Sequence, residues 1–213
     1  MVGEPPKPRW RGRIHLVAFL VSIPAGLALV LFSEGISAHV GAAIFAASLI
    51  ALFGTSAIYH TGNWAPNVRA RLRQMDHAMI FVLIAGSYTP ITLLALQPAW
   101  GISLLAIVWT VAVIGVTIAL ARFGALHRLG GYLYIGMGWI VVLALPAVVT
   151  SLAPSELMLL FAGGVLYTVG AIGLRLHRPD PRPLVFGYHE VWHAMTVAAA
   201  ACHFTLVAML VRA

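Results

Sequence analysis

Apolar stretches of about 20 residues follow one another from Ile14 almost to the C-terminus, and they constrain this chain more than any other feature. Crossing roughly 30 Å of hydrocarbon takes about 20 helical residues, so each stretch is long enough to span a membrane. The composition agrees, since 61% of the 213 residues are hydrophobic and only 9% are charged. The mean hydropathy of +0.95 is far above that of ordinary soluble domains. We therefore expect an all-α, multi-pass protein of the cell membrane.

The hydropathy pattern predicts a seven-transmembrane helix bundle. The spans are placed, to within about 2–4 residues, at 14–32, 40–60, 77–97, 100–121, 131–150, 155–174 and 188–210. The first run follows basic residues as in a signal peptide, but it lacks a convincing small-residue cleavage site and is expected to be retained. The chain then divides into a basic N-terminal segment, residues 1–13, and a single seven-helix domain, residues 14–211. Prolines inside spans one, three and five predict kinks at Pro24, Pro90 and Pro146.

The basic residues are distributed unevenly over the connections between the spans. Twelve of the thirteen fall in the N-terminal segment and in the loops after spans two, four and six: Lys7, Arg9, Arg11, Arg13, Arg69, Arg71, Arg73, Arg122, Arg128, Arg175, Arg178 and Arg182. The positive-inside rule assigns these connections to the cytoplasm. The N-terminus is therefore predicted to be cytoplasmic and the C-terminus extracytoplasmic. The net charge of +7 is explained by this topology, so no nucleic-acid partner is expected.

The strongest local motif is His189-Glu190-Val191-Trp192-His193, at the start of the last span. Two histidines at positions i and i+4 lie on one helical face, where both imidazoles can reach one metal ion, and zinc suits such ligands. The motif also reads H-E-x-x-H, the metalloprotease pattern in which the glutamate is the general base. The single cysteine, Cys202, excludes a cage of several thiolates, so a metal must use His, Asp or Glu.

The predicted topology brings further ligand candidates to the same membrane level. Span two ends at His60, with Ser56 one turn deeper on the same face, and span three begins just after Asp76. The alternative is that these residues have only a structural role at helix ends, where they face lipid headgroups and Asp76 caps the N-terminus of span three. Ionisable groups at membrane depth are costly, however, and four of them on three helices favour a functional site.

The remaining histidines carry weaker signals. His77 is an alternative ligand, and His203 lies about 21 Å further along the last helix, where packing, hydrogen bonding or a cavity lining is expected. The others lie at span ends, where an interfacial position is expected. These are His15, His39, His127 and His177.

At these residues the chain resembles the hemolysin III family, bacterial relatives of the progestin and adiponectin receptors. The matching segments are Ser56-Ala-Ile-Tyr-His60, Asp76-His-Ala-Met-Ile with Ala85-Gly-Ser-Tyr-Thr-Pro90, and Phe186-Gly-Tyr-His-Glu-Val-Trp-His193. The resemblance implies zinc bound by His60, His189 and His193, with Asp76 acting through a water molecule and Ser56 nearby. The chain departs from the family at Arg11-Gly-Arg-Ile-His15, where an acidic, Asn-containing stretch before a Thr-His pair is frequent. No role is therefore carried over to that region.

Three functions compete. The favoured one is a zinc-dependent hydrolase acting on membrane lipid amides or esters, because three histidines and one water form the open arrangement of a catalytic zinc. Asp76 would then accept a proton, and Ser56 would orient the water or donate to the oxyanion. The second is a non-enzymatic regulator of membrane lipid state in which zinc clamps three helices. A membrane metalloprotease with Glu190 as base ranks third, and a pore-forming toxin ranks below it. The expected partner is membrane lipid, as substrate or ligand.

The charge asymmetry generates a first prediction. A reporter fused at the N-terminus is expected to be cytoplasmic, and one fused after Ala213 extracytoplasmic, because twelve basic residues lie on one side of an odd number of spans. Paired fusions active on opposite sides of the membrane check this. Reporters found on the same side would mean an even number of spans and would remove the shared level of the metal ligands.

Overall fold

The structure is a computed structural model that describes residues 7–121 and 130–212. Arg122, Arg128 and His127, expected in the loop after span four, lie outside the described residues, as do residues 1–6 of the N-terminal segment and Ala213. The described elements follow in chain order. They are α1 (Arg13–Leu31), α2 (Ile36–Thr61), α3 (Pro66–Leu94), α4 (Pro98–Leu120), α5 (Gly130–Gly138), η2 (Ile140–Ala144), α6 (Leu145–Ser151), α7 (Pro154–Leu176) and α8 (Tyr188–Leu210).

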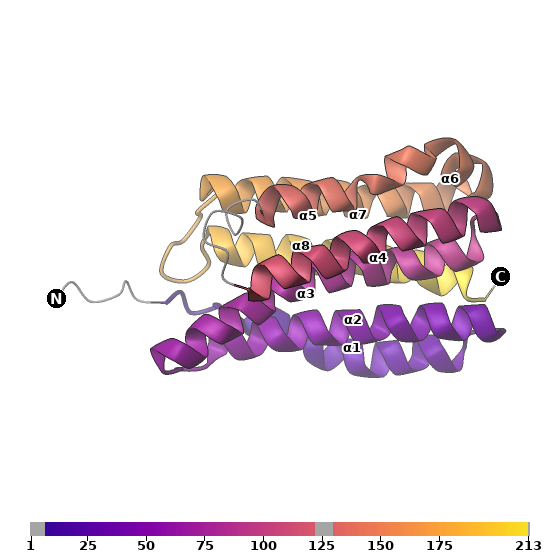
Figure 1. Ribbon diagram of the computed structural model, residues 1–213. Coiled ribbons are helices and arrows are strands. Elements are labelled where there is room, and N and C mark those ends of the chain that lie inside the picture. The colour runs from indigo at the N-terminus through magenta and orange to yellow at the C-terminus, as the bar shows by residue number, and fades with distance from the viewer. Residues whose placement is uncertain (1–6, 122–129, 213) are drawn as a thin grey trace.

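Within these residues, seven helical segments are long and apolar enough to cross a membrane, which confirms the predicted bundle. The fifth of them is the combined segment Tyr132–Ser151, built from most of α5 together with η2 and α6. The helices run side by side along one axis, and the start of α1 and the end of α8 lie at opposite ends of the bundle (Figure 1). The assignment of one end to the cytoplasm stays a prediction.

Helix α3 is the most buried of the spans and belongs to both halves of the core. One apolar cluster joins it to α4, the fifth span and α7, and a second joins it to α1, α2 and α8. Close approach of α2 and α3 depends on Gly86, because a Cβ there would lie 2.2 Å from the Ser48 hydroxyl oxygen. Small residues allow this kind of backbone contact between membrane helices.

The third span begins eleven residues earlier than predicted. Helix α3 starts at Pro66. Proline is tolerated in the first turn of a helix, because its missing N–H would have no helical partner there. Arg69, Arg71 and Arg73 therefore lie on the first turns of this helix, and the expected loop containing them is absent from the described structure. Asp76 consequently lies inside α3 and is not its N-cap, so the capping explanation for this residue is wrong.

The fifth span also differs from the prediction, which was one helix kinked at Pro146. The α-helix stops after Gly138, continues as the 3-10 turn η2, and resumes as α6 with Pro146 in its first turn. The Tyr88 hydroxyl repairs the break, because it donates to the Gly138 carbonyl at 2.8 Å and accepts from the Val141 N–H at 2.9 Å. The tertiary contact with Tyr88 therefore replaces the helical hydrogen bonds lost at the break. The membrane interior has no water that could bind these backbone groups instead.

This contact generates a stability prediction. Tyr88→Phe leaves a buried carbonyl and a buried N–H short of a partner, which typically costs about 1–3 kcal/mol. The midpoint of thermal unfolding in detergent is expected to fall. Tyr132→Phe is the matched control, since Tyr132 lies on the interrupted fifth span but is 65% exposed, and this variant should unfold like wild type. Equal midpoints for the two variants would show that the break does not depend on Tyr88.

Candidate metal centre

Three histidines meet where α2 ends and α8 begins. His60 lies in the last turn of α2, and His189 and His193 lie one turn apart at the start of α8. The start of α8 is fixed by Glu190, whose Oε2 accepts a hydrogen bond from the Gly187 N–H at 2.8 Å. Such a capping interaction holds the first helical turn in place. It thereby fixes the positions from which both α8 histidines project.

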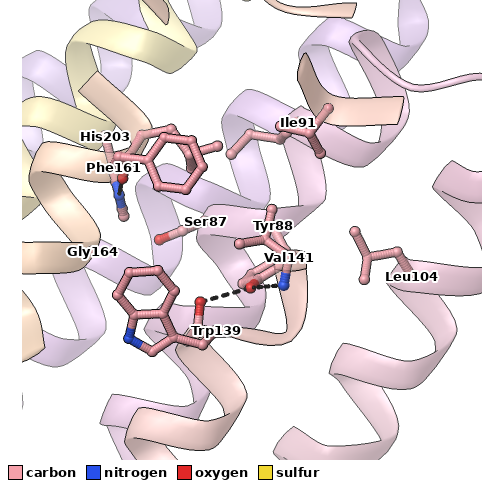
Figure 2. Close-up of a pocket in the computed structure, with 12 residues that line it drawn as sticks. Ser87, Tyr88, Ile91, Leu104, Trp139, Val141, Phe161, Gly164 and His203 are labelled. Atoms are coloured by element: carbon pink, nitrogen blue, oxygen red, sulfur yellow. Dashed lines mark hydrogen bonds between the residues drawn. The ribbon is translucent and has the colours of Figure 1, made fainter. Parts of the chain in front are cut away.

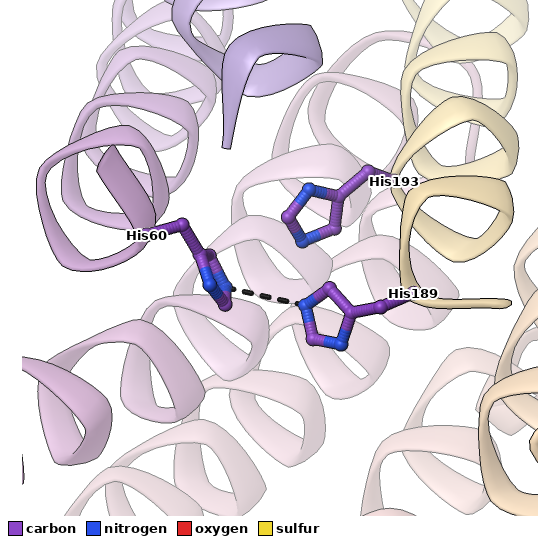
Figure 3. A group of neighbouring side chains, drawn as sticks. All are labelled: His60, His189 and His193. Carbon is purple, nitrogen blue, oxygen red and sulfur yellow. Dashed lines mark hydrogen bonds between the residues drawn. The ribbon is translucent and has the colours of Figure 1, made fainter. Parts of the chain in front are cut away.

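The three imidazoles face one another across the gap between the two helices (Figure 3). Their ring centroids are 4.6–4.9 Å apart, and one nitrogen of each ring lies within 4.8 Å of the corresponding nitrogens of the others. The Nε2 atoms of His60 and His189 are separated by 3.3 Å. His60 and His193 are buried, at 8% and 2% exposure, and His189 is partly buried.

This arrangement fits a metal ion that prefers imidazole. Two donors 2.0–2.1 Å from one tetrahedral zinc lie about 3.3 Å apart, which matches the Nε2 separation of His60 and His189. His193 also has a buried Nδ1 with no hydrogen-bond partner among the described residues. Buried polar atoms normally have partners, so an unsatisfied imidazole in a cluster of three indicates a site built to bind something. The cluster can hold a metal ion.

Asp76 and Ser56 lie beside the histidine cluster. The Oδ2 atom of Asp76, projecting from α3, is 3.8 Å from Nε2 of His60. Ser56 is 2% exposed, and its hydroxyl lies within hydrogen-bonding reach of the Asp76 carboxylate. Since Asp76 is too far from the His60 nitrogen for a direct hydrogen bond, it flanks the cluster at the distance of an indirect partner. The structure thus brings all five candidate residues to one place.

Glu190 does not face this cluster as a free base. Its side chain is fully buried, Oε1 pairs with Nε of Arg11 at 2.5 Å, and Oε2 caps α8. Both carboxylate oxygens are therefore committed to structural contacts. The glutamate of the H-E-x-x-H motif therefore caps a helix and forms an ion pair. This removes the main support for the metalloprotease hypothesis, which needs that glutamate as a general base.

His15 contradicts the expectation of an interfacial position. Its side chain is 3% exposed and stacks on His193, with ring centroids 3.7 Å apart and planes inclined by 11°. No sequence pattern indicates this contact, because an isolated histidine near the start of an apolar span is typical of interfacial residues. His77, the alternative ligand, has its Nδ1 2.7 Å from the Arg73 carbonyl oxygen and is not part of the cluster of three.

His203 lies deeper in the bundle, as expected, and takes no part in the cluster. Its Nε2 is 3.3 Å from the Leu160 carbonyl oxygen, and its ring lines a small cavity together with Ser87, Tyr88 and Trp139 (Figure 2). The cavity offers about 40 Å³ to water-sized molecules, and its walls are mostly apolar. The prediction of a packing or cavity-lining role for His203 is consistent with this position.

Comparison with known proteins gives a consistent result over nearly the whole chain. The family model of Haemolysin-III related proteins matches residues 4–204. A protein named Hemolysin-3 homolog from Bacillus subtilis (strain 168) is 32% identical over 196 residues, covering 91% of this chain and 89% of the relative. A protein named Hemolysin-3 from Bacillus cereus is also 32% identical over 196 residues, covering 91% of this chain and 86% of the relative.

The cluster geometry generates a metal-binding prediction. His60→Ala, His189→Ala and His193→Ala are each expected to purify without zinc, because each would remove one of the three candidate ligands. Asp76→Ala should retain zinc with an affinity lowered about 10- to 100-fold, the usual cost of losing an indirect partner. Elemental analysis of the purified proteins and competition with a chelator measure both quantities.

His203→Ala serves as the control, since it removes an imidazole from the same helix α8 outside the cluster, and it should keep wild-type zinc. Stoichiometric zinc in a protein carrying all three alanine replacements would disprove the assignment.

Proposed function

Because this chain belongs to the haemolysin III family and is a multi-pass membrane protein, we propose that its histidine cluster holds zinc in a hydrolase for membrane lipids. The bonds cleaved would be amides or esters. The observation that carries the proposal is the combination of three converging imidazoles with a carboxylate, Asp76, placed 3.8 Å from the nearest of them.

The number of protein ligands supports a catalytic site. Structural zinc normally has four protein ligands, whereas catalytic zinc has three and keeps one position open. His60, His189 and His193 would supply three ligands. The Asp76 carboxylate lies 3.8 Å from the nearest of these rings and would not be a fourth. Zinc bound there would supply a Lewis acid that polarises a carbonyl group and makes water acidic near neutral pH.

Asp76 and Ser56 then have distinct tasks. The Asp76 carboxylate, with Oδ2 directed toward His60, is placed to accept a proton from an attacking water molecule and to return it to the leaving group. The Ser56 hydroxyl, within reach of Asp76, can hold that carboxylate in position or donate to a developing oxyanion. Ser56 lies on α2 and Asp76 on α3, so the packing of these two helices sets the spacing of the two side chains.

The position of the cluster supports membrane lipids as the proposed substrate class. It lies at helix ends, next to the first turns of α3 that carry Arg69, Arg71 and Arg73, and so close to the expected boundary between hydrocarbon and water. The amide and ester groups of membrane lipids occupy the same boundary, between apolar chains and polar headgroups. A lipid could therefore present its carbonyl group to the cluster while its chains stay in the membrane.

The competing function is a regulator in which zinc clamps α2 to α8 without chemistry. The low exposure of His60 and His193 favours it, because a substrate has less access to a closed site. The two functions differ in what they require of Asp76. A clamp needs only its shape and hydrogen bonds, whereas a hydrolase needs its ability to accept a proton.

Asp76→Asn separates the two functions, because it keeps the side-chain shape and removes the proton acceptor. General base catalysis typically contributes about 10² to 10⁴ in rate, so the variant is expected to retain zinc and lose most of its turnover. The measurement is hydrolysis of a panel of lipid amides and esters in proteoliposomes, followed by mass spectrometry, beside zinc content. Glu34→Gln, a carboxylate outside the cluster, is the control and should behave like wild type.

Wild-type turnover in zinc-loaded Asp76→Asn would contradict the role of this residue as base. A zinc-loaded wild type that hydrolyses no member of the panel would favour the clamp.

A further inference from the structure

The segment before α1 crosses the end of the bundle at the histidine cluster. Its backbone N–H groups at Arg9 and Trp10 donate to the carbonyl oxygens of Leu184 and Val185, each at 3.1 Å, in the connection leading to α8. The Lys7 ammonium donates to the Gly62 carbonyl oxygen, just after α2, at 3.2 Å. The segment is therefore tied to both helices that carry the metal-ligand candidates.

Gly12 shows how closely this segment approaches His60. It has φ +78°, a left-handed conformation that favours glycine, and a Cβ at this position would lie 2.6 Å from Cβ of His60. The backbone thus rests directly on the base of the His60 side chain, which limits the positions that this side chain can take.

Arg11 fixes the same segment to α8. Its guanidinium Nε pairs with Oε1 of Glu190 at 2.5 Å, and Glu190 is fully buried. A buried carboxylate without a partner is strongly unfavourable, so the pair holds Arg11 in place. Since Glu190 lies between His189 and His193 in the sequence, the ion pair joins the N-terminal segment to the helical turn that presents both histidines.

His15, in the first turn of α1, completes these contacts. It is 3% exposed and stacks on His193 at a centroid distance of 3.7 Å, and it makes an edge contact with Phe53 of α2 at a centroid distance of 5.1 Å. Neither of its ring nitrogens has a hydrogen-bond partner among the described residues. The face-to-face contact of this ring among the described residues is therefore its stack on His193.

The stacked geometry excludes His15 as a ligand of the same ion in this arrangement. An imidazole binds a metal through a nitrogen lone pair that lies in the plane of the ring. The His15 and His193 planes are nearly parallel, at 11°, and are separated by about the thickness of an aromatic ring. Two such rings cannot both direct in-plane lone pairs at one ion about 2 Å away.

We propose that His15 is a positioning residue of the metal centre: its stack on His193 fixes the plane in which that imidazole offers its lone pair. Gly12 packs against His60 of α2, and Arg11 forms an ion pair with Glu190 of α8. The segment that leads into α1 thereby sets the spacing between the candidate ligands on these two helices. This inference rests on the proposed metal centre, and it gives the N-terminal region a role that neither the sequence nor the family resemblance assigned.

The test compares two variants of similar size, His15→Phe, which keeps a flat face, and His15→Leu, which keeps the apolar volume alone. Zinc affinity is measured by chelator competition, and ligand geometry by the visible absorption bands of the Co²⁺-loaded protein. His15→Leu is expected to bind zinc about 10- to 100-fold more weakly and to shift the Co²⁺ bands, as loss of an orienting neighbour does. His15→Phe is expected to stay within about threefold of wild type with unshifted bands.

Thermal unfolding of the metal-free proteins separates a local effect from general destabilisation, because the two variants should unfold at similar temperatures. His39→Leu, at an exposed position on α2, is the matched control and should bind zinc like wild type.

The outcomes distinguish this inference from the proposed function. If the wild type binds no zinc, or if His193→Ala keeps it, the metal centre itself is wrong and the role of His15 is lost with it. If His193→Ala empties the site while His15→Leu keeps wild-type affinity and bands, only the role of His15 is disproved. Equal losses in His15→Phe and His15→Leu would show that the ring nitrogens matter and would overturn positioning by stacking. Complete loss of zinc in both variants would identify His15 as a direct ligand.

Discussion

The membrane interior offers no water to hydrogen-bond with, and the structure follows from that constraint. Each span satisfies its backbone groups as a helix, and the described interruption of the fifth span is repaired by the Tyr88 hydroxyl. Hydroxyl side chains in the spans obey the same rule, since Ser87 and Thr89 donate to carbonyl oxygens one turn back. Among the described residues, the exceptions are buried polar atoms of His15, Tyr167, His193 and His203, and two of these four residues lie at the histidine cluster.

Much of this molecule could be predicted from local signals. Span number follows from hydropathy. The i, i+4 pair and the charge asymmetry bring His60, Asp76, His189 and His193 to one level, and the choice of the three histidines as ligands follows from the family resemblance. The start of α3 could not be predicted in the same way. Hydropathy measures preference for lipid, whereas Arg69 to Arg73 form a helix that extends beyond the apolar stretch. The break before Pro146 depends on Tyr88, a contact between distant parts of the chain.

Glu190 and His15 show where sequence patterns mislead. Glu190 completes a protease motif by its letters, yet its carboxylate caps a helix and pairs with an arginine. His15 resembles an interfacial residue, yet it is buried against His193. Each pattern is shared by residues in different environments, and only the three-dimensional neighbours decide between them. Arg11, which pairs with Glu190, and His15 lie four residues apart, so one short segment of the chain makes both contacts.

The contacts that complete the cluster join the earliest and latest parts of the chain. Arg11 and Glu190 are separated by 179 residues, and His60 and His189 by 129. Because a membrane protein is synthesised from its N-terminus, α1 and α2 leave the ribosome long before α8 exists. The cluster is therefore assembled last, after the seventh span has inserted, and an incomplete chain has no place to take up an ion. Metal uptake at this site would accordingly mark the end of biogenesis.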